Sequence, residues 1–203
     1  MGTQYAKVAS DELLNTTVEA LQGNGFSVNV VENADEAKKA VLKLIPKGSE
    51  VFTNTSVTLD EAGIAEVLNG SDYVSARNKM LALYGDPKKK KEMKRIAGTP
   101  EFAIGSAHAI TQDGKILVAS ASGSQIPAEA YGSENVIFVV GAQKLVKDLD
   151  EGIKRIEEYV VPLEDERAMA AYGTHTALAK LLVLMLDSPE RVTVIIIKDK
   201  IGF

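Results

Sequence analysis

Residues Ser49–Leu68, SEVFTNTSVTLDEAGIAEVL, decide the fold that the sequence predicts. They read as a short buried strand, then a turn rich in hydroxyl and amide side chains, then an amphipathic helix. In open α/β sheets, ligands bind outside the carboxyl ends of the strands, where this turn would lie. The small hydrogen-bonding side chains of the turn are Thr53, Asn54, Thr55, Ser56 and Thr58. The turn is therefore a candidate ligand site.

The same residues also have a purely structural explanation. Thr58–Glu61 fits a capping box, in which Thr58 and Glu61 satisfy each other's backbone amides at the start of the helix. Asp60 and Glu61 already occupy the positive end of the helix dipole, so a bound phosphate would compete with two carboxylates. A ligand with hydroxyl or amide groups suits the turn at least as well. A capped connection that binds no ligand is the alternative.

The segments before this stretch alternate between helix and strand. Apolar spacing predicts a helix over about residues 10–22, which glycines stop, and β-branched residues predict a strand over 26–31. A second capping-box pattern at Asn33–Glu36 opens a helix to about Leu44, and Pro46 ends it. Strand, helix and strand in this order predict a right-handed parallel crossover.

The alternation continues after the focal helix. Further elements are predicted as a short strand at 72–74, an interrupted helix over 77–97, a strand within 101–111, and helices at 126–130, 148–159 and 163–172. Asp148 is the predicted cap of the helix at 148–159. Asp113-Gly114 predicts a hairpin whose two central turn residues both take positive φ. Asn135–Val140 and Val192–Lys198 read as buried strands, whereas 176–186 could be helix or strand. The expected fold of residues 1–203 is a single α/β domain with a mostly parallel sheet, flanking helices and an embedded β-hairpin.

Composition supports one globular domain and excludes several functions. A chain of 203 residues, 45% hydrophobic and 25% charged, can build one sizeable core. The net charge of −5 argues against a general nucleic-acid binder, and the one strong charge run, Lys88–Lys91, is interpreted as a solvated helix face. The absence of cysteine excludes disulfides, thiolate nucleophiles and cysteine-ligated metal clusters.

Neither a targeting segment nor a membrane segment is predicted. The first residues are polar and lack a basic segment followed by an apolar core, so no secretion signal is expected. The longest apolar run near the end, Leu181–Leu186, is much shorter than the ~20 residues of a membrane span. We therefore expect a cytoplasmic protein that has no membrane partner.

Several segments, taken together, resemble the LUD domain family, which includes the C subunit of the lactate-utilisation proteins. They are TNTSVTLDEAG, IGSAHAITQDGKILVASASGSQ, VIFVVGAQKLVKDLDEGIKRIEEYVVPLEDER and the terminal VIIIKDKIGF. The resemblance runs in order over about residues 39–203. It implies a fold like that of ribose-5-phosphate isomerase, glucosamine-6-phosphate deaminase and the CoA transferases. This fold agrees with the strand and helix order predicted above.

The resemblance also bears on cofactors and partners. Some relatives carry cysteines between the last helix and the last strand, whereas residues 172–191 contain none here. A metal or cluster in that segment is therefore not expected, and no cofactor is predicted. The lactate-utilisation system is associated with iron–sulfur redox partners, so redox-protein subunits are candidate partners of this chain. Whether the chain forms a homo-oligomer stays open.

Three turns are expected to meet at one edge of the sheet: 54–58, 105–108 together with 122–125, and 141–144. The two glycines among them would let backbone approach a ligand closely. None of these turns matches a P-loop or a dinucleotide-binding fingerprint. The predicted ligand-binding residues are Asn54, Thr55, Ser56, Thr58, Gly105, Ser106, His108, Ser122, Gly123, Ser124, Gln125 and Lys144.

Two residues are candidates for catalysis, and each has a structural alternative. His108 could be a general acid or base, or a buried structural imidazole. Glu61 could be a base or an acyl acceptor, by analogy with CoA transferases that use a glutamate, or it could only cap its helix. His175 has no carboxylate at metal-binding spacing, so no metal site is predicted. Arg167 is expected to pair with an acid of its own helix.

Three functions remain open on the sequence alone. The first is a LUD-type protein that binds or converts a small carboxylate, an acyl-CoA or a sugar phosphate, with a link to lactate utilisation implied by the resemblance. The second is a non-catalytic accessory subunit of an oxidoreductase complex. The third is an isomerase of phosphosugars. The fold does not choose among them, and the sequence discloses neither the substrate nor whether a reaction is catalysed.

Overall fold

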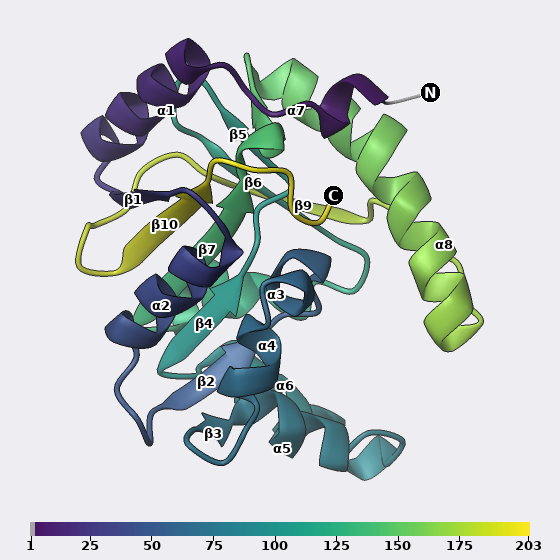
Figure 1. The fold of residues 1–203 in the computed structure, drawn as a ribbon. Coiled ribbons are helices and arrows are strands. Elements are labelled where there is room, and N and C mark those ends of the chain that lie inside the picture. Colours follow the sequence, from purple (N-terminus) through teal and green to yellow (C-terminus); the bar gives the residue numbers. More distant parts are fainter. Residues whose placement is uncertain (1–2) are drawn as a thin grey trace.

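The computed structural model describes residues 3–203, which form two β-sheets and the helices that cover them (Figure 1). The main sheet has six parallel strands in the order β1-β10-β7-β4-β2-β3. Its strands are β1 (Ser27–Val31), β2 (Glu50–Thr53), β3 (Val74–Ser75), β4 (Phe102–Gly105), β7 (Asn135–Gly141) and β10 (Val192–Ile197). The predicted α/β class with a mostly parallel sheet is confirmed.

The predicted hairpin is present and belongs to a second sheet of four strands. The order of this sheet is β8-β5-β6-β9, with β5 (Ala109–Thr111) antiparallel to β6 (Ile116–Ser120). β8 (Leu145–Val146) lies parallel to β5, and β9 (Lys180–Leu184) lies antiparallel to β6. The segment that periodicity left open at 176–186 therefore contains a strand, which forms one edge of this sheet.

The hairpin turn differs from its prediction in one respect. Gly114 takes positive φ, +79°, whereas Asp113 does not, so the prediction of positive φ at both residues was wrong. The Thr111 amide donates to the carbonyl oxygen of Lys115, and the Gly114 amide donates to that of Thr111. The loop thus spans three residues, and a loop of this length needs only one left-handed residue to close.

Helices occupy most of the remaining chain. They are α1 (Asp11–Gly23), α2 (Ala34–Leu44), α3 (Val57–Glu61), α4 (Ile64–Leu68), α5 (Ala76–Ala82), α6 (Lys90–Gly98), α7 (Leu149–Arg155) and α8 (Val161–Tyr172). Two π-helical turns, Ala128–Gly132 and Ile156–Val160, interrupt the pattern, and the second joins α7 to α8. Short 3-10 turns lie at Thr3–Ala6, Pro87–Lys89 and Ala142–Lys144. Within residues 3–203, none of the helices has both the length and the apolar character needed to span a membrane.

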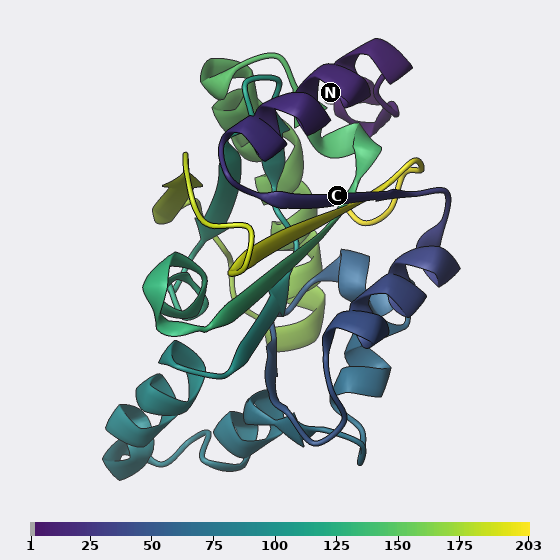
Figure 2. The ribbon, with the colours of Figure 1, turned by 90° about the vertical axis from the view of Figure 1, so that its left-hand side faces the viewer.

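Both faces of the main sheet are buried, which explains the nearly continuous apolar runs of its central strands. In β7, Phe138 packs with α1 and the second sheet, whereas its neighbours Ile137 and Val139 pack with α2, α3 and α4. None of these three side chains is more than 2% exposed. Figure 2 shows α1 and α2 on opposite sides of β1 and β10.

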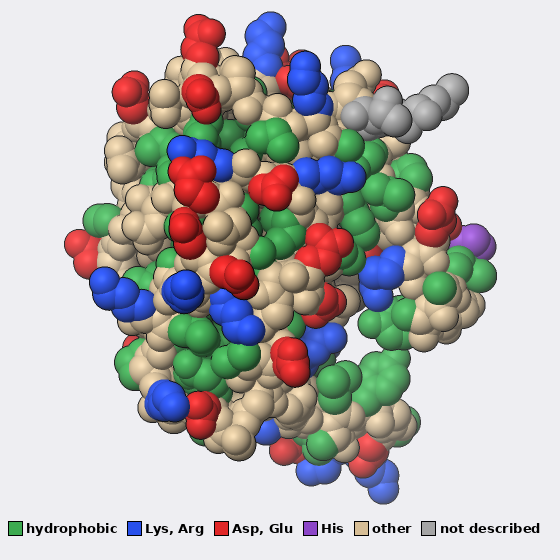
Figure 3. Space-filling view, in the orientation of Figure 1, with side chains coloured by type: hydrophobic (Ala, Val, Ile, Leu, Met, Phe, Trp, Pro, Cys, Tyr) green, Lys and Arg blue, Asp and Glu red, His purple; other side chains and the backbone are tan. Residues whose placement is uncertain are grey.

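Two further layers shape the functional region. α7 and the turn after it cover the outer face of the second sheet, where Ile156 packs against Ala109 and Leu117. α5 and α6 pack against Phe52 near the outer end of the main sheet. A notch between α8 and the α5–α6 pair is visible at the right of Figure 3, with hydrophobic side chains on both margins.

Two of the predicted helix caps are confirmed. Asn33 Oδ1 accepts a hydrogen bond from the Glu36 amide, and Asp148 Oδ1 accepts one from the Glu151 amide at 2.9 Å. Each cap satisfies an amide that has no partner within its own helix. These caps depend on residues within one helical turn, which is why the local sequence was sufficient to predict them.

Replacing Asp148 by alanine is expected to lower the free energy of unfolding by about 1 kcal/mol, because an orphan amide of α7 loses its acceptor. Urea unfolding of both proteins measures the difference. Asp150→Ala is the matched control, since Asp150 lies exposed in the same first turn and caps nothing. It should change stability by a few tenths of a kcal/mol. Equal losses in the two variants would contradict this role of Asp148.

Candidate functional site

Three turns at the carboxyl edge of the main sheet meet at one lysine. Lys144 follows β7, and its Nζ donates to Thr58 Oγ1 at 2.9 Å and to Ser106 Oγ at 3.1 Å. Thr58 lies on α3 after β2, and Ser106 follows β4 directly. Because β2, β4 and β7 run parallel in one sheet, the segments that leave their carboxyl ends lie at the same edge.

A cleft of about 860 Å³ opens over this cluster. We call it the cleft throughout. Its apolar lining includes Met80, Tyr84, Met93, Ala168 and Tyr172, which lie on or next to α5, α6 and α8. Its polar lining includes most of the predicted ligand-binding residues: Asn54, Thr55, Ser56, Thr58, Ser106, His108, Ser122, Ser124, Gln125 and Lys144. That these residues bind a ligand stays a prediction.

The two glycines expected beside a ligand do not line the cleft. A Cβ at Gly105 would lie 2.5 Å from Asn54 Nδ2 and 3.0 Å from Glu129 Oε1, so this glycine makes room for a pair of protein side chains. A Cβ at Gly123 would lie 2.6 Å from Cδ of Lys180, and Gly123 takes φ +81° in its turn. That these glycines bring backbone close to a ligand stays a prediction.

The expected capping box at Thr58–Glu61 does not form. α3 begins at Val57, so Ser56 is the cap, and its hydroxyl accepts from the Leu59 amide at 3.4 Å. Thr58 is buried and its hydroxyl contacts Lys144 instead. Glu61 does not line the cleft, and its Oε2 accepts from the Gly202 amide at 2.7 Å. Contacts with residues far along the chain compete with a local cap, which the sequence pattern cannot show.

Lys144 lies in a setting that favours its neutral form. Only 2% of the residue is exposed. Burial and, to a lesser extent, the positive charge of Arg155 lower the pKa of Lys144 to about 7, against a smaller opposing effect of Glu61. Within residues 3–203, no carboxylate forms an ion pair with Lys144. Around neutral pH the amine therefore exists in both protonation states.

His108 is held as a neutral imidazole on the wall of the cleft. Its Nδ1 accepts a hydrogen bond from the Ala119 amide at 3.0 Å, so the ring hydrogen lies on Nε2. Burial, and then the positive charges of Lys144 and Arg155, lower the pKa of His108 to about 3. The ring thus has the satisfied nitrogen of a structural histidine, and it still offers one N–H donor in the cleft.

Arg155 is a positive charge that contributes to both pKa shifts, and sequence reasoning missed it. Its guanidinium is fully buried, donates from Nη1 to the backbone oxygen of His108, and lies 5.3 Å from the centre of the Tyr159 ring. Its Nε and Nη2 have no partner among the described residues. Burial lowers the pKa of Arg155 to about 10. The signal in the sequence is its place on the buried face of α7, one turn after Gly152.

Asn54 and Glu129 form a second buried pair next to Gly105, and the sequence did not predict this pair. Glu129, on the π-helical turn Ala128–Gly132, is 1% exposed, and its Oε1 accepts from Asn54 Nδ2 at 2.6 Å. Its Oε2 and Asn54 Oδ1 have no partner among the described residues. Burial raises the pKa of Glu129 to about 8, although the Asn54 hydrogen bond opposes the shift. A lone acid in the run Pro127–Gly132 is the only signal in the sequence.

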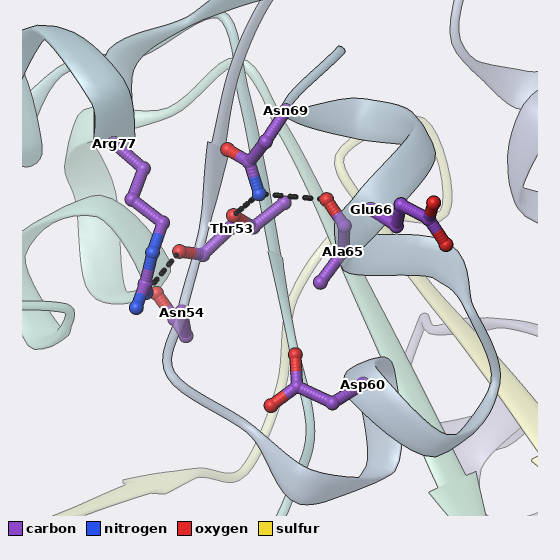
Figure 4. A pocket seen from close by; sticks show the side chains of 7 residues that line it. All are labelled: Thr53, Asn54, Asp60, Ala65, Glu66, Asn69 and Arg77. Atoms are coloured by element: carbon purple, nitrogen blue, oxygen red, sulfur yellow. Dashed lines mark hydrogen bonds between the residues drawn. The ribbon is translucent and has the colours of Figure 1, made fainter. Parts of the chain in front are cut away.

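Arg77, which sequence reasoning also missed, separates the cleft from a smaller hollow of about 410 Å³ (Figure 4). Its Nη1 donates to the Thr53 backbone oxygen at 3.1 Å and to Thr55 Oγ1 at 3.0 Å. Within the described residues it forms no ion pair. Figure 4 shows Asp60 across the smaller hollow, while Glu66 points away from Arg77. Arg77 is thus a half-buried cation that lacks a carboxylate partner.

The other charged groups at the rim of the cleft are already paired. Arg167 makes a two-point ion pair with Glu164 at 2.7 and 2.8 Å, which confirms the predicted pairing within its helix. His175 Nδ1 lies 2.9 Å from Asp165 Oδ2 and is largely exposed. In the part of the chain that the structure describes, no three His, Asp or Glu side chains lie close enough to hold a metal ion.

Comparisons with known proteins bear on family and fold. A protein-family description named LUD domain matches residues 14–197. A crystal structure of a DUF162 family protein from Deinococcus radiodurans is similar, with a TM-score of 0.59, 14% identity, and coverage of 94% of this chain and 99% of that one. That of eIF2B beta from Chaetomium thermophilum has a TM-score of 0.38 and 16% identity, over 58% of this chain and 44% of that one. No curated protein matches.

Proposed function

Because the chain belongs to the LUD domain family, in which the sequence left several ligand classes open, we propose that the cleft binds a small carboxylic acid. The ligand class is a short acid that carries a hydroxyl, an oxo or an acyl group. Its carboxylate pairs with Arg77, its polar group meets the hydroxyls around Lys144, and its carbon chain lies along the apolar wall of the cleft. A volume of about 860 Å³ leaves ample room for such a molecule.

The unpaired guanidinium of Arg77 is the observation that carries this proposal. Guanidinium groups match carboxylates in shape and bind them through two parallel hydrogen bonds. The Thr53 and Thr55 oxygens hold Arg77 through its Nη1, and the other nitrogens make no hydrogen bond to the described residues. Arg167, by contrast, already has Glu164 as its carboxylate. A ligand carboxylate would give Arg77 the partner that residues 3–203 do not supply.

The same charges favour a carboxylate over a phosphate. A phosphate group needs several donors or cations, whereas the cleft offers one unpaired guanidinium and an amine whose pKa is about 7. Glu164 adds a negative charge at the rim. The cleft therefore favours a carboxylic acid ligand over the sugar phosphate that a phosphosugar isomerase would bind. Lactate, the compound implied by the family resemblance, falls within the proposed class, and an acyl-CoA would have to leave its phosphates outside the cleft.

A thermal-shift screen tests the proposal with lactate and related hydroxy acids, 2-oxo acids, acyl-CoA esters and phosphorylated sugars. A ligand that binds only the folded state raises the melting temperature, and at a concentration of about 100 Kd it adds about 2.7 kcal/mol of stability. We expect the short carboxylic acids to raise the melting temperature. We expect phosphorylated sugars to leave it unchanged.

Two arginine variants decide whether the cleft is responsible. Arg77→Met is expected to abolish the shift, because the carboxylate loses its partner. Arg95→Met is the matched control, since Arg95 lies exposed on α6 and does not line the cleft, and it should keep the full shift. A full shift in Arg77→Met would overturn the proposal. A screen in which no carboxylic acid binds would also overturn it and favour the accessory-subunit reading.

A further inference from the structure

We infer that the ligand of the cleft is a carbonyl compound of the 2-oxo acid class and that Lys144 forms a Schiff base with it. This inference deepens the proposed function and rests on the same cleft, with the ligand carboxylate at Arg77. It adds a covalent step that neither the fold nor the family implies. It is carried by the position of the amine in the cleft and by the neutral polar groups around it.

The amine of Lys144 has the position and the partners of a nucleophile. Lys144 lines the cleft although it is almost fully buried, so its Nζ is reached from the cleft rather than from bulk solvent. Both of its protein partners are hydroxyls, Thr58 and Ser106, and hydroxyls accept from a neutral amine without fixing its charge. A lysine that served only to neutralise a buried acid would have a carboxylate partner. Neutral amines are the form of lysine that adds to carbonyl groups.

A buried cation favours the neutral form of the Lys144 amine. Arg155 lies buried beside the site, bound to the backbone of His108, and its charge opposes a second positive charge at Lys144. Glu61 acts in the other direction, but it is engaged with the Gly202 amide and does not line the cleft. A neighbouring cation together with burial is a known way to activate a lysine nucleophile. In this protein Arg155 supplies that cation from within the fold.

Neutral polar groups lie where the carbonyl group of the ligand would bind. His108 lines the cleft as a neutral ring whose Nε2 carries the hydrogen, because the Ala119 amide occupies Nδ1. A neutral N–H donor can polarise a carbonyl without adding a full positive charge beside the amine. The hydroxyl of Ser106, which accepts a hydrogen bond from Lys144 Nζ, lies at the same place. Amine, imidazole and hydroxyl thus surround the position that a carbonyl group would take.

The reaction balances without an added oxidant or reductant. The lone pair of Lys144 Nζ attacks the carbonyl carbon, and the electron pair of the C=O π bond moves to oxygen, which takes up a proton. The amine nitrogen of the resulting carbinolamine loses one proton. The hydroxyl then takes up a second proton and leaves as water while the nitrogen lone pair forms the C=N bond, and the nitrogen releases its remaining proton. The net change is amine plus carbonyl to imine plus one water.

Reductive trapping tests the inference. The protein is incubated with pyruvate and sodium cyanoborohydride at about pH 7.5, and the modified lysines are identified by peptide mass mapping. We expect at least about tenfold more modification at Lys144 than at the exposed Lys147, since only an amine with a lowered pKa is largely neutral at that pH. Modification at Lys144 should increase as the pH rises through about 7, because the neutral amine is the reactive form.

Variants and a matched ligand separate this inference from the proposed function. Lys144→Met should lose the trapped adduct, and Lys147→Met should keep it. Lactate, which has the carboxylate but no carbonyl, should compete with pyruvate and yield no adduct. If lactate and pyruvate raise the melting temperature but pyruvate forms no adduct at Lys144, the Schiff base is overturned and carboxylate binding stands. If neither acid binds and no adduct forms, both the proposed function and the Schiff base are overturned. Equal modification of Lys144 and Lys147 would show that Lys144 reacts like any exposed lysine, which would also overturn the Schiff base.

Discussion

Replacing Glu129 by glutamine is expected to raise the free energy of unfolding by up to about 5 kcal/mol near pH 9 and to change this free energy little near pH 4. Burial raises the pKa of the Glu129 carboxyl from 4.5 to about 8 in the folded protein. Between these two values the folded state holds a proton that the unfolded state has released. Stability from this group is therefore present at low pH and is lost as the pH rises from about 4.5 to about 8. Glutamine, which does not ionise, removes that loss.

The pair with Asn54 makes glutamine a suitable replacement. Asn54 Nδ2 donates to Oε1 of Glu129, and the amide oxygen of glutamine can accept the same hydrogen bond. The Oε2 atom has no partner among the described residues, so the amide group that replaces it breaks no contact there. The two side chains also have nearly equal volume. The predicted difference thus comes from ionisation and not from packing.

Urea unfolding at about pH 4, 6, 8 and 9 measures this effect as the difference between variant and parent. Glu134→Gln is the matched control, because Glu134 lies exposed five positions further along the chain. Its difference from the parent should stay within about 0.5 kcal/mol at every pH. A constant difference between Glu129→Gln and the parent across the pH range would refute a buried, protonated Glu129. Lys144 titrates in both proteins alike, so its contribution cancels.

Replacing Gly202 by alanine is expected to cost about 2–4 kcal/mol of stability and to weaken ligand binding in the cleft. Gly202 takes φ +61°, where a side chain is disfavoured, and this accounts for about 1 kcal/mol. A Cβ there would also lie 2.8 Å from the backbone nitrogen of Thr58 and 3.1 Å from its Cα. Backbone atoms cannot move aside as the end of a side chain can. The clash would therefore displace Thr58, whose hydroxyl holds Lys144.

Gly173→Ala separates the two causes. Gly173 takes a closely similar φ, +67°, but a Cβ there would meet no atom within 4 Å. It should cost only the ~1 kcal/mol of the left-handed backbone. Thermal unfolding compares the two variants, and the thermal-shift screen compares their binding of lactate and pyruvate. Equal losses of stability in Gly202→Ala and Gly173→Ala would show that Gly202 does not clash with Thr58.

Short-range features of this protein were predictable because the residues that make them are close in sequence. The cap at Asp148 needs only the amide of Glu151. The hairpin at Asp113-Gly114 needs two β-like runs and a glycine, although the length of its loop was not evident. β7 could be identified because a strand with both faces buried is apolar throughout. Together these features were enough to predict the α/β class.

The hydrogen-bond partners and neighbours of the residues at the site could not be predicted in the same way. Thr58 and Glu61 fit a capping box by spacing, but Lys144 and Gly202 lie far along the chain and take their hydrogen bonds. Gly105 was expected beside a ligand, and Asn54 and Glu129 fill the space next to it. In each case two or more interactions were compatible with the sequence. The three-dimensional arrangement decided between them.

By itself, the sequence determined the alternation of strands and helices, and thereby the edge of the sheet at which three polar turns would lie. Only the tertiary structure decided the chemical state of that edge. The pKa values of Lys144, His108 and Glu129 depend on burial, and those of Lys144 and His108 depend also on the buried charge of Arg155, which comes from a helix covering the second sheet. Desolvation is a property of everything packed around a group, and residues distant in sequence supply that packing.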